Sequence, residues 1–386
     1  MWSQMKIQLE TLSLLHIGNG TFLQKGTDFI VENDSLHVVN LDKLAAVLNF
    51  DQDLIQQWSD TIVRNESEAF IRAHLGSSSL DDISKRVVAS RISFDRRQTT
   101  LKEYIHDGFG RPYVPGSSLK GSIRTAVMAT LARPRVAPLI EEREKALQAL
   151  AQEPKSEKEM KKLQSDVWRH FRDNLLKMEK TVLGASPEKS LFRYLSTGDA
   201  FFEKGIEMAV MQINLNIRKS SSLLDDSKQQ PIEVIPSGVS SSFRMNVKPE
   251  FLNRLGLATA DRLFLLINDH TRDLVESEID FWQEGDRCSY TDKDQYLAEL
   301  NKVLGVVRSC KSGECVLRIG QASGWRFVTG AWLEELKRLD KTSFEREIVN
   351  LARRKNRDFY SDYPFPKSRR IDGESHLMGF VKLKIS

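Results

Sequence analysis

The strongest chemical signal in the sequence is the segment 112–124, Pro-Tyr-Val-Pro-Gly-Ser-Ser-Leu-Lys-Gly-Ser-Ile-Arg. A Pro-Gly turn leads into a predicted helix that Ser117 or Ser118 can cap. The free N–H groups and positive dipole end of such a helix bind anions. Lys120 and Arg124, four residues apart, add cations on one face. The pattern predicts a phosphate site without the Walker A spacing, and the alternative is an ordinary capped helix with two surface cations.

Two further segments contain residues suited to contacts with an anion. Residues 317–326 read Leu-Arg-Ile-Gly-Gln-Ala-Ser-Gly-Trp-Arg, and Gly320, Gly324 and Gly330 allow close backbone approach to a ligand or a neighbouring strand. Their spacing does not match the dinucleotide GxGxxG pattern, which argues against a Rossmann cofactor site. The segment 317–326 fits both a tight turn between a strand and a helix and a backbone contact with phosphate. The segment 364–370, Pro-Phe-Pro-Lys-Ser-Arg-Arg, is a basic extended loop of low specificity.

Catalytic and metal-ligating patterns are weak. The seven histidines show no HExxH or paired spacing, and His16 alone lies beside a glycine turn, where a structural role is the more common one. Asp28 follows a glycine loop, but one carboxylate does not make a metal site. The three cysteines form no CxxC pair, which favours a reducing cytosol over a disulfide scaffold or a cysteine zinc site. We therefore predict no catalytic residue, metal or cofactor.

The charge of the chain is unevenly distributed. The net charge is only +4, but residues 85–135 carry 11 basic and 3 acidic side chains and residues 318–386 carry 15 and 9. Two basic segments on an otherwise acidic chain indicate a local polyanion site, with nucleic acid as the leading partner and scattered solvated charges as the alternative. An anionic membrane fits less well, because neither segment forms one broad amphipathic helix.

Length and composition are those of an ordinary globular protein. The 386 residues suffice for about two to three domains at ~150 residues each. Hydrophobic residues make up 40% and charged residues 28%, and no apolar run reaches the roughly 18 residues of a membrane helix. The N-terminus has no signal-peptide core. We expect a cytoplasmic protein with no membrane partner, and the family resemblance described below adds that its source is prokaryotic.

The elements that must position these residues can be read from local patterns. Alternation predicts a strand over 5–17, a hairpin over 29–39, and a helix capped by Asn40. Residues 54–75 and the hairpin 133–183 read as helical, the latter with a Ser156–Glu159 capping box. The remaining predictions are strands at 191–194, 200–218, 232–247, 315–319 and 378–385, a polar loop at 219–230, and helices at 259–275, 292–308 and 331–339. This interleaving predicts an α+β or α/β protein with helical insertions.

Taken together, these segments resemble the RAMP superfamily of CRISPR proteins. The stretches that carry the resemblance are 15–20 (Leu-His-Ile-Gly-Asn-Gly), 115–124, 235–238 (Ile-Pro-Ser-Gly), 320–324, and 365–367 followed by 379–382. The Pro-Gly-Ser-Ser-Leu-Lys-Gly block is specific to the superfamily. The order of the stretches is most similar to the subunit that caps the backbone filament of type III-A (Csm) interference complexes at the 3′ end of the guide RNA.

The resemblance implies an α+β fold with an RRM-like, ferredoxin-type RAMP core. One interrupted domain would span 1–386, with a helical insertion at 51–95, a helical hairpin at 133–185 and a mainly helical insertion at 250–312. It also implies that guide RNA is bound through its backbone, because the sequence has no RNP-type aromatic cluster. The implied RNA-binding residues are His16, Gly18, Gly116, Ser117, Ser118, Lys120, Arg124, Gly320, Ser323, Gly324, Arg326, Lys367 and Arg369.

The resemblance further implies partners and two enzymatic alternatives. The partners would be guide RNA, neighbouring RAMP backbone subunits, target RNA indirectly, and host nucleases recruited for guide maturation in antiviral defence. One alternative is a target-RNA-cleaving backbone subunit that uses Asp28, although its Gly-Thr-Asp-Phe-Ile context departs from that pattern. The other is a metal-independent guide-processing nuclease with His16 as general base, although the C-terminal glycine spacing departs from that enzyme's loop. We expect a structural subunit rather than an enzyme.

Overall fold

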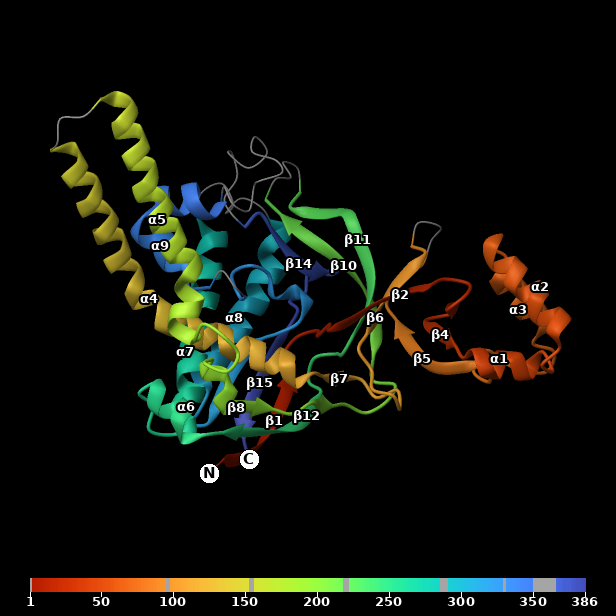
Figure 1. Cartoon of the computed structure of the whole chain (residues 1–386). Coiled ribbons are helices and arrows are strands. Elements are labelled where there is room, and N and C mark those ends of the chain that lie inside the picture. The colour runs from red at the N-terminus through yellow and green to blue at the C-terminus, as the bar shows by residue number, and fades with distance from the viewer. Residues whose placement is uncertain are drawn as a thin grey trace.

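The computed structural model of the chain describes residues 2–92, 94, 98–152, 156–217, 222–284, 291–328, 331–349 and 366–386. Figure 1 shows helices and sheets in three regions: a helix-rich body with a projecting helical hairpin, a second sheet beside it, and a small helical group at the far end from the hairpin. Parts of several predicted segments lie outside the described residues, namely 153–155, 218–221, Gly330 and 364–365.

The first sheet has five strands in the order β13-β15-β1-β12-β8. Alternation in β1 buries Ile7 and Leu9 completely, while Gln8 and Glu10 between them are exposed. A strand whose successive side chains point to opposite faces does this when only one face of the sheet is covered. The strands are β1 (Ser3–Thr11), β8 (Leu195–Thr197), β12 (Ser240–Val247), β13 (Glu314–Arg318) and β15 (Phe380–Ile385), and every paired neighbour is antiparallel.

The connections of this sheet confirm the ferredoxin-type core. Two long helices, α4 (Gly116–Ala151) and α7 (Ala260–Gln283), supply the crossovers. The chain runs β1–α4–β8–β12–α7–β15, and the strand order β15-β1-β12-β8 is that of a split βαβ unit, with β13 added at one edge. Together with α8 (Asp294–Ser309), these helices bury one continuous apolar core against the sheet. The fold is α+β with helical insertions, as predicted.

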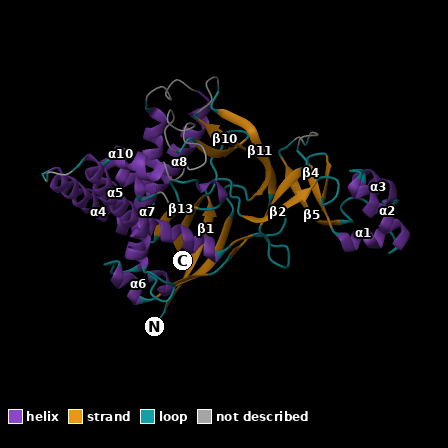
Figure 2. Ribbon diagram, turned by 45° about the horizontal axis from the view of Figure 1, so that its top comes forward, coloured by secondary structure: helices purple, strands orange, loops and turns teal. Residues whose placement is uncertain are grey.

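The second sheet pairs segments from many parts of the chain. Its path is β2-β6-β11-β10-β5-β4-β3, and β14 also pairs with β10. The strands are β2 (Gly18–Gln24), β3 (Phe29–Glu32), β4 (Ser35–Val39), β5 (Ser84–Ser90), β6 (Thr100–Tyr104), β10 (Met208–Asn216), β11 (Leu224–Val234) and β14 (Ser368–Asp372), and a separate pair joins β7 (Tyr113–Val114) to β9 (Ala200–Phe201). Figure 2 shows this sheet between the helical body and the small helices at the far end.

The small helices at the far end are α1 (Leu41–Val47), α2 (Gln52–Val63) and α3 (Ser67–His74). The Asn40 side chain caps α1 by accepting bonds from the N–H groups of Asp42 and Lys43, as the sequence predicted. These helices bury their own cluster around Ile30, Leu44 and Ile71. The remaining short helices are α6 (Pro249–Arg254), α9 (Leu333–Leu339) and α10 (Lys341–Phe344).

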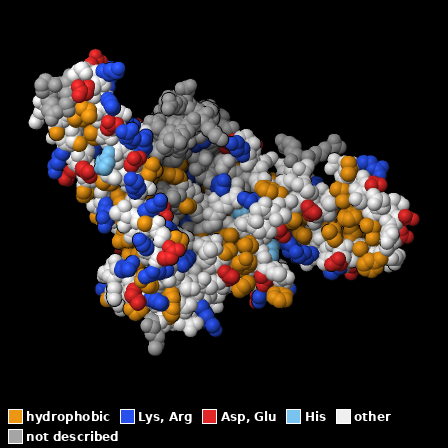
Figure 3. Space-filling model, in the orientation of Figure 1, with side chains coloured by type: hydrophobic (Ala, Val, Ile, Leu, Met, Phe, Trp, Pro, Cys, Tyr) orange, Lys and Arg blue, Asp and Glu red, His pale blue; other side chains and the backbone are white. Residues whose placement is uncertain are grey.

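The predicted helical hairpin is present, but its first helix is longer than predicted. α4 begins at Gly116 and continues through Pro134 and Pro138, and α5 spans Glu157–Leu183. Ser156 caps α5 by accepting a bond from the N–H of Glu159. Each proline removes one backbone donor, but burial of residues such as Val127 and Val136 on the core stabilises α4 across them. Figure 3 shows acidic and basic side chains interspersed over the hairpin.

The strands predicted over 200–218 and 232–247 are interrupted, at 202–207 and at 235–239. Three further local predictions are wrong. Residues 191–194 form a 3-10 turn rather than a strand, because Ser190 caps the N–H of Phe192. Most of the predicted polar loop 219–230 is the start of β11, whose pairing with β10 shows that polar side chains on an exposed face do not prevent strand formation. The strand predicted over 5–17 ends at Thr11, and Leu14 and Leu15 make isolated bridges with other segments. The insertion boundaries at 51–95, 133–185 and 250–312 stay predictions.

Candidate functional site

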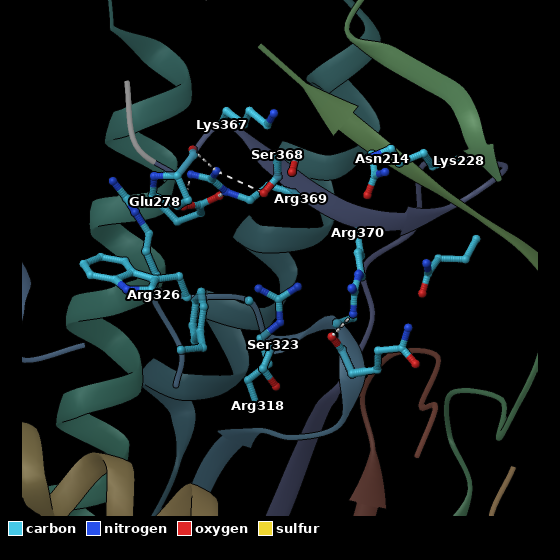
Figure 4. Close-up of a pocket in the computed structure, with 17 residues that line it drawn as sticks. Asn214, Lys228, Glu278, Arg318, Ser323, Arg326, Lys367, Ser368, Arg369 and Arg370 are labelled. Atoms are coloured by element: carbon cyan, nitrogen blue, oxygen red, sulfur yellow. Dashed lines mark hydrogen bonds and ion pairs between the residues drawn. The ribbon is translucent and has the colours of Figure 1, made fainter. Parts of the chain in front are cut away.

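A basic pocket lies between the glycine loop that follows β13 and strand β14. Its cavity volume is about 530 Å³, a size typical of ligand sites. Figure 4 shows side chains from several segments around the hollow. Among the described residues, the charged side chains that line it are the carboxylate of Glu278 and the cations of Lys228, Arg318, Arg326, Lys367, Arg369 and Arg370. An excess of cations in a partly enclosed space favours an anionic ligand.

Glu278 of α7 pairs with two of these arginines inside the protein. Its carboxylate lies 3.0 Å from Nη1 of Arg326 and 3.0 Å from Nη2 of Arg369. Trp282 and Tyr296 also donate to it, at 2.9 and 3.0 Å. Burial alone would raise the pKa of Glu278, but Arg369 and Arg326 outweigh burial and lower it to about 2. The charges of Arg326 and Arg369 are therefore already paired, and their contact with RNA stays a prediction.

The structure brings the glycine loop and the first glycine turn together, although His16 and Gln321 are 305 positions apart in the sequence. Gln321 donates its backbone N–H to the carbonyl oxygen of His16 at 3.2 Å. Gly320 has a φ of +82°, and a Cβ there would lie 2.4 Å from the same oxygen, so only glycine fits. The close approach at Gly320 is thus to a neighbouring segment of backbone. Gly18 is equally confined, since a Cβ there would lie 3.0 Å from Nε2 of His16.

His16 is a buried neutral side chain. It is 2% exposed, and its Nδ1 lies 2.6 Å from the carbonyl oxygen of Glu233. Burial lowers the pKa of His16 to about 4, and the nearby charges of Lys102 and Arg370 act in the same direction. At neutral pH the ring is uncharged and enclosed. This geometry suits a residue that fixes the glycine turn in place rather than a cation that contacts RNA phosphates.

Gln321 connects several residues that the sequence reasoning did not select. Its side-chain oxygen accepts a bond from Nζ of Lys102, and its backbone oxygen accepts one from Nη1 of Arg370 at 2.8 Å. Burial lowers the pKa of both cations, and Arg370 adds to the effect on Lys102. Arg370 lies next to Arg369 in the basic segment 364–370, and Lys102 lies in the basic segment 85–135. The local excess of positive charge was therefore the sequence signal for both residues.

The start of α4 is built differently from the predicted anion site. Its N-cap is Pro115, and neither Ser117 nor Ser118 caps the helix through its side chain. The N–H of Gly116 donates instead to the Asp199 carboxylate at 2.7 Å. The serine-capping prediction is wrong because a side chain from the β8–β9 turn occupies the first free donor. A Cβ at Gly116 would lie 2.2 Å from the carbonyl oxygen of Thr197, so this contact also requires glycine.

Lys120 and Arg124 lie on the same face of α4, as predicted. Burial lowers the pKa of Lys120, with a further contribution from Arg124. Arg124 pairs with Glu179 of α5 and lies over the ring of Phe192 at 5.7 Å. Ser122 between them donates to the carbonyl oxygen of Arg318 at 3.0 Å, which places this helix start beside the strand that leads into the basic pocket. Ser117 is exposed and Ser118 half-buried.

Ser323, Gly324, Lys367 and Asp28, the remaining residues singled out from the sequence, lie in loops and turns. Ser323 is buried and donates to the carbonyl oxygen of Gly320 at 3.0 Å, and Gly324 has a φ of +69° in the same loop. Lys367 lines the pocket, and its carbonyl oxygen accepts the N–H of Ile217 at 3.0 Å. Asp28 accepts the N–H of Gln24 at 2.8 Å within a turn.

Within the described part of the chain, one group of side chains has ligand atoms close enough to hold a cation: Asp372, Glu374 and His376. The Asp372 carboxylate already accepts the N–H groups of Glu374 and His376, at 3.0 and 2.7 Å. It also lies 2.9 Å from Nδ1 of His376. These bonds account for the cluster as a turn after β14.

Comparison with known families and curated proteins agrees with this architecture. The sequence profile of the RAMP superfamily matches residues 8–327. A curated protein of Streptococcus thermophilus, named CRISPR system Cms protein Csm5, is 29% identical over 139 residues, which cover 32% of this chain and 38% of that protein. A Methanocaldococcus jannaschii protein of the same name is 22% identical over 317 residues, which cover 77% of this chain and 68% of that protein.

Two solved structures share the fold across the whole chain. One is a chain in a cryo-EM structure of a Csm–crRNA–target RNA ternary complex of a type III-A CRISPR-Cas system, with a TM-score of 0.68, 19% identity and full coverage of both chains. The other is the crystal structure of T. onnurineus Csm5, with a TM-score of 0.62, 19% identity, and coverage of 97% of this chain and 99% of that one. Among the described residues, no helix is both long and apolar enough to cross a membrane.

Proposed function

The chain belongs to the RAMP superfamily, and from this premise we propose that it is a guide-RNA-binding structural subunit of a type III-A Csm interference complex. In this proposal it caps the 3′-end of the backbone filament and supports guide maturation and antiviral defence. Its partners are guide RNA and the neighbouring RAMP subunits. The curated relatives that carry the name Csm5, and the similarity in fold to a chain of a Csm–crRNA–target RNA complex, support the assignment.

The observation that carries the proposal is the basic pocket at the junction of the glycine loop, β14 and the first glycine turn. The second basic segment supplies most of the cations that line it, and Lys102 of the first basic segment bonds to Gln321, which lines the pocket beside Arg370. The start of α4 is tied to the same place through Ser122 and Arg318. A surface of this kind follows an RNA backbone by charge rather than by base readout.

Binding to single-stranded RNA tests this proposal directly. If about five phosphates are neutralised, the log–log salt slope is near −3.5, or roughly 100-fold between 50 and 200 mM salt. The double variant Lys120→Ala/Arg124→Ala should weaken binding to unrelated labelled RNAs by similar factors, measured by fluorescence anisotropy. The matched control is Lys161→Ala/Arg169→Ala, which removes two exposed cations from α5. Salt-independent affinity, or equal binding by the two double variants, contradicts the proposal.

The two nuclease alternatives depend on residues with unfavourable surroundings. A general base needs access to the proton it abstracts, whereas His16 is 2% exposed and held by Glu233. Asp28 holds a turn through the N–H of Gln24. Labelled guide and target RNA, incubated with the protein with and without Mg²⁺, provides the assay. Cleavage that disappears in Asp28→Ala would show that the chain is the target-RNA-cleaving subunit. Cleavage that disappears in His16→Ala would show that it is the guide-processing nuclease.

A further inference from the structure

Arg318 has surroundings unlike those of the other arginines in the pocket. It ends β13 immediately before the glycine loop, is 4% exposed, and lines the cavity. Its Nε donates to the carbonyl oxygen of Met378 at 3.0 Å. The guanidinium lies 4.7 Å from the ring centroid of Phe327 and 4.9 Å from that of Phe380. These contacts fix the position of the charged group.

The charge of Arg318 has no bonded counterion among the described residues. No carboxylate in that part of the chain lies within 4 Å of its guanidinium, and its fully enclosed Nη2 donates no hydrogen bond there. Burial lowers the pKa of Arg318 by more than the nearby Tyr296 and Glu278 raise it, whereas the pKa of the buried Arg369 is raised because Glu278 outweighs burial. A buried charge without a bonded carboxylate is unfavourable, so within the described part of the chain the pocket lacks an anion on this side.

We infer that this pocket accepts one phosphate group, which pairs with the Arg318 guanidinium; the inference rests on the proposed RNA-binding function and specifies its anchor point. Guanidinium groups bind phosphate oxygens in pairs through their planar fork. Lys228 and Arg370 line the same cavity from β11 and β14, and Glu278 is already shared by two other arginines. The excess of cations favours a phosphate over a carboxylate.

The phosphate can belong to the RNA backbone or to an RNA terminus. Both sources present the same oxygens to Arg318, and a cavity of about 530 Å³ leaves room for an attached nucleoside. A dinucleotide without terminal phosphates, such as UpU, offers only a diester. A nucleoside monophosphate such as UMP offers only a monoester.

Thermal unfolding in different anions tests the inference on the full chain. Relative to sodium chloride of equal ionic strength, sodium phosphate should raise the Tm of the wild-type protein by about 1–3 °C, because it binds only the folded state. Arg318→Met should lose this shift and should unfold at the same or a higher Tm in chloride, since it removes an uncompensated buried charge. Arg308→Met, which removes an exposed guanidinium paired with Glu276, should keep the full shift.

Further arms separate the possible outcomes. Arg318→Lys keeps the charge without the fork, should retain a smaller shift, and replaces Arg318→Met if that variant does not fold. UMP and UpU in place of phosphate tell a terminal site from a backbone site. An equal shift in acetate, an absent shift in the wild type, or a full shift in Arg318→Met overturns the inference. If RNA binding then keeps its salt dependence, the proposed function stands without it; loss of RNA binding by the wild type removes both.

Discussion

Glu278 determines how the charges of the pocket are divided. It is fully buried and holds Arg326 and Arg369, which come from the glycine loop and from β14. A buried ion pair of this kind contributes little relative to an apolar replacement, but removal of one partner leaves an uncompensated charge. The carboxylate therefore holds the glycine loop and β14 together at the wall of the pocket.

We expect Glu278→Gln to lower the free energy of unfolding by about 3–5 kcal/mol, because two buried guanidinium groups lose their counterion. Urea denaturation at pH 7 measures the change. Glu276→Gln, two residues away on the same helix, removes the exposed partner of Arg308 and should cost less than about 1 kcal/mol. Equal effects of the two substitutions would contradict the assignment of Glu278 as the buried counterion of Arg326 and Arg369.

The same carboxylate predicts a dependence of stability on pH. The pKa of Glu278 is about 2 in the folded protein against an ordinary value of 4.5. Its contribution is therefore complete above pH 4.5 and is lost as the pH falls from 4.5 towards 2. Between pH 5 and 3.5 the free energy of unfolding of the wild type should fall more steeply than that of Glu278→Gln. Parallel pH profiles from urea denaturation would refute this.

At the scale of elements, α4 joins the core, the hairpin and the pocket. Its first residue lies against the β8–β9 turn, its Ser122 bonds to the end of β13, and its far half pairs with α5. The helix start is therefore a packing junction as well as part of the candidate RNA surface. Two glycines of this helix, Gly116 and Gly121, differ in their surroundings, because Gly116 lies against the turn and Gly121 faces open space.

Gly116→Ala should destabilise the protein by about 1–3 kcal/mol, because the new Cβ would lie 2.2 Å from the carbonyl oxygen of Thr197 and the backbone must move. Gly121→Ala has nothing within 4 Å of the new Cβ and should stabilise the helix by about 1 kcal/mol. Urea midpoints of both variants provide the measurement. A neutral Gly116→Ala would show that the contact with the turn relaxes freely.

At the scale of the whole molecule, the α4–α5 hairpin and the α1–α3 helices extend from opposite ends of the core (Figure 1). The hairpin buries Val136, Phe171, Leu175 and Met178 near its base, and the exposed positions dominate towards its tip. A projecting element with a packed base can cover an assembly face without contributing to the fold. This makes it our candidate for the surface that ends filament growth.

Replacement of residues 147–165 by a short Gly/Ser linker tests that assignment. The deletion leaves the buried base in place, so the protein should fold with a Tm close to that of the wild type and should bind RNA equally well. Complexes assembled with it should have irregular filament ends, measured by native mass spectrometry. If the ends are normal, the tip of the hairpin does not cap the filament and another surface must.

The sequence by itself determined those features that depend on neighbours in the chain. Asn40 and Ser156 cap helices whose free N–H groups lie two or three residues away, so a short pattern is sufficient to identify them. The α+β class, the helical hairpin and the ferredoxin-type core followed from periodicity and from the resemblance to the RAMP superfamily. Each of these predictions is confirmed by the fold.

Only the tertiary structure decided how the charged residues are used. Glu278 meets partners 48 and 91 positions away, and the first donor of α4 meets Asp199, 83 positions away. No local spacing encodes such pairs, so the sequence could not tell Arg326 and Arg369, which pair with Glu278, from Arg318, which has no bonded carboxylate among the described residues. The physical reason is that the state of a buried charge depends on which groups share its enclosure, and that is fixed when distant segments pack together.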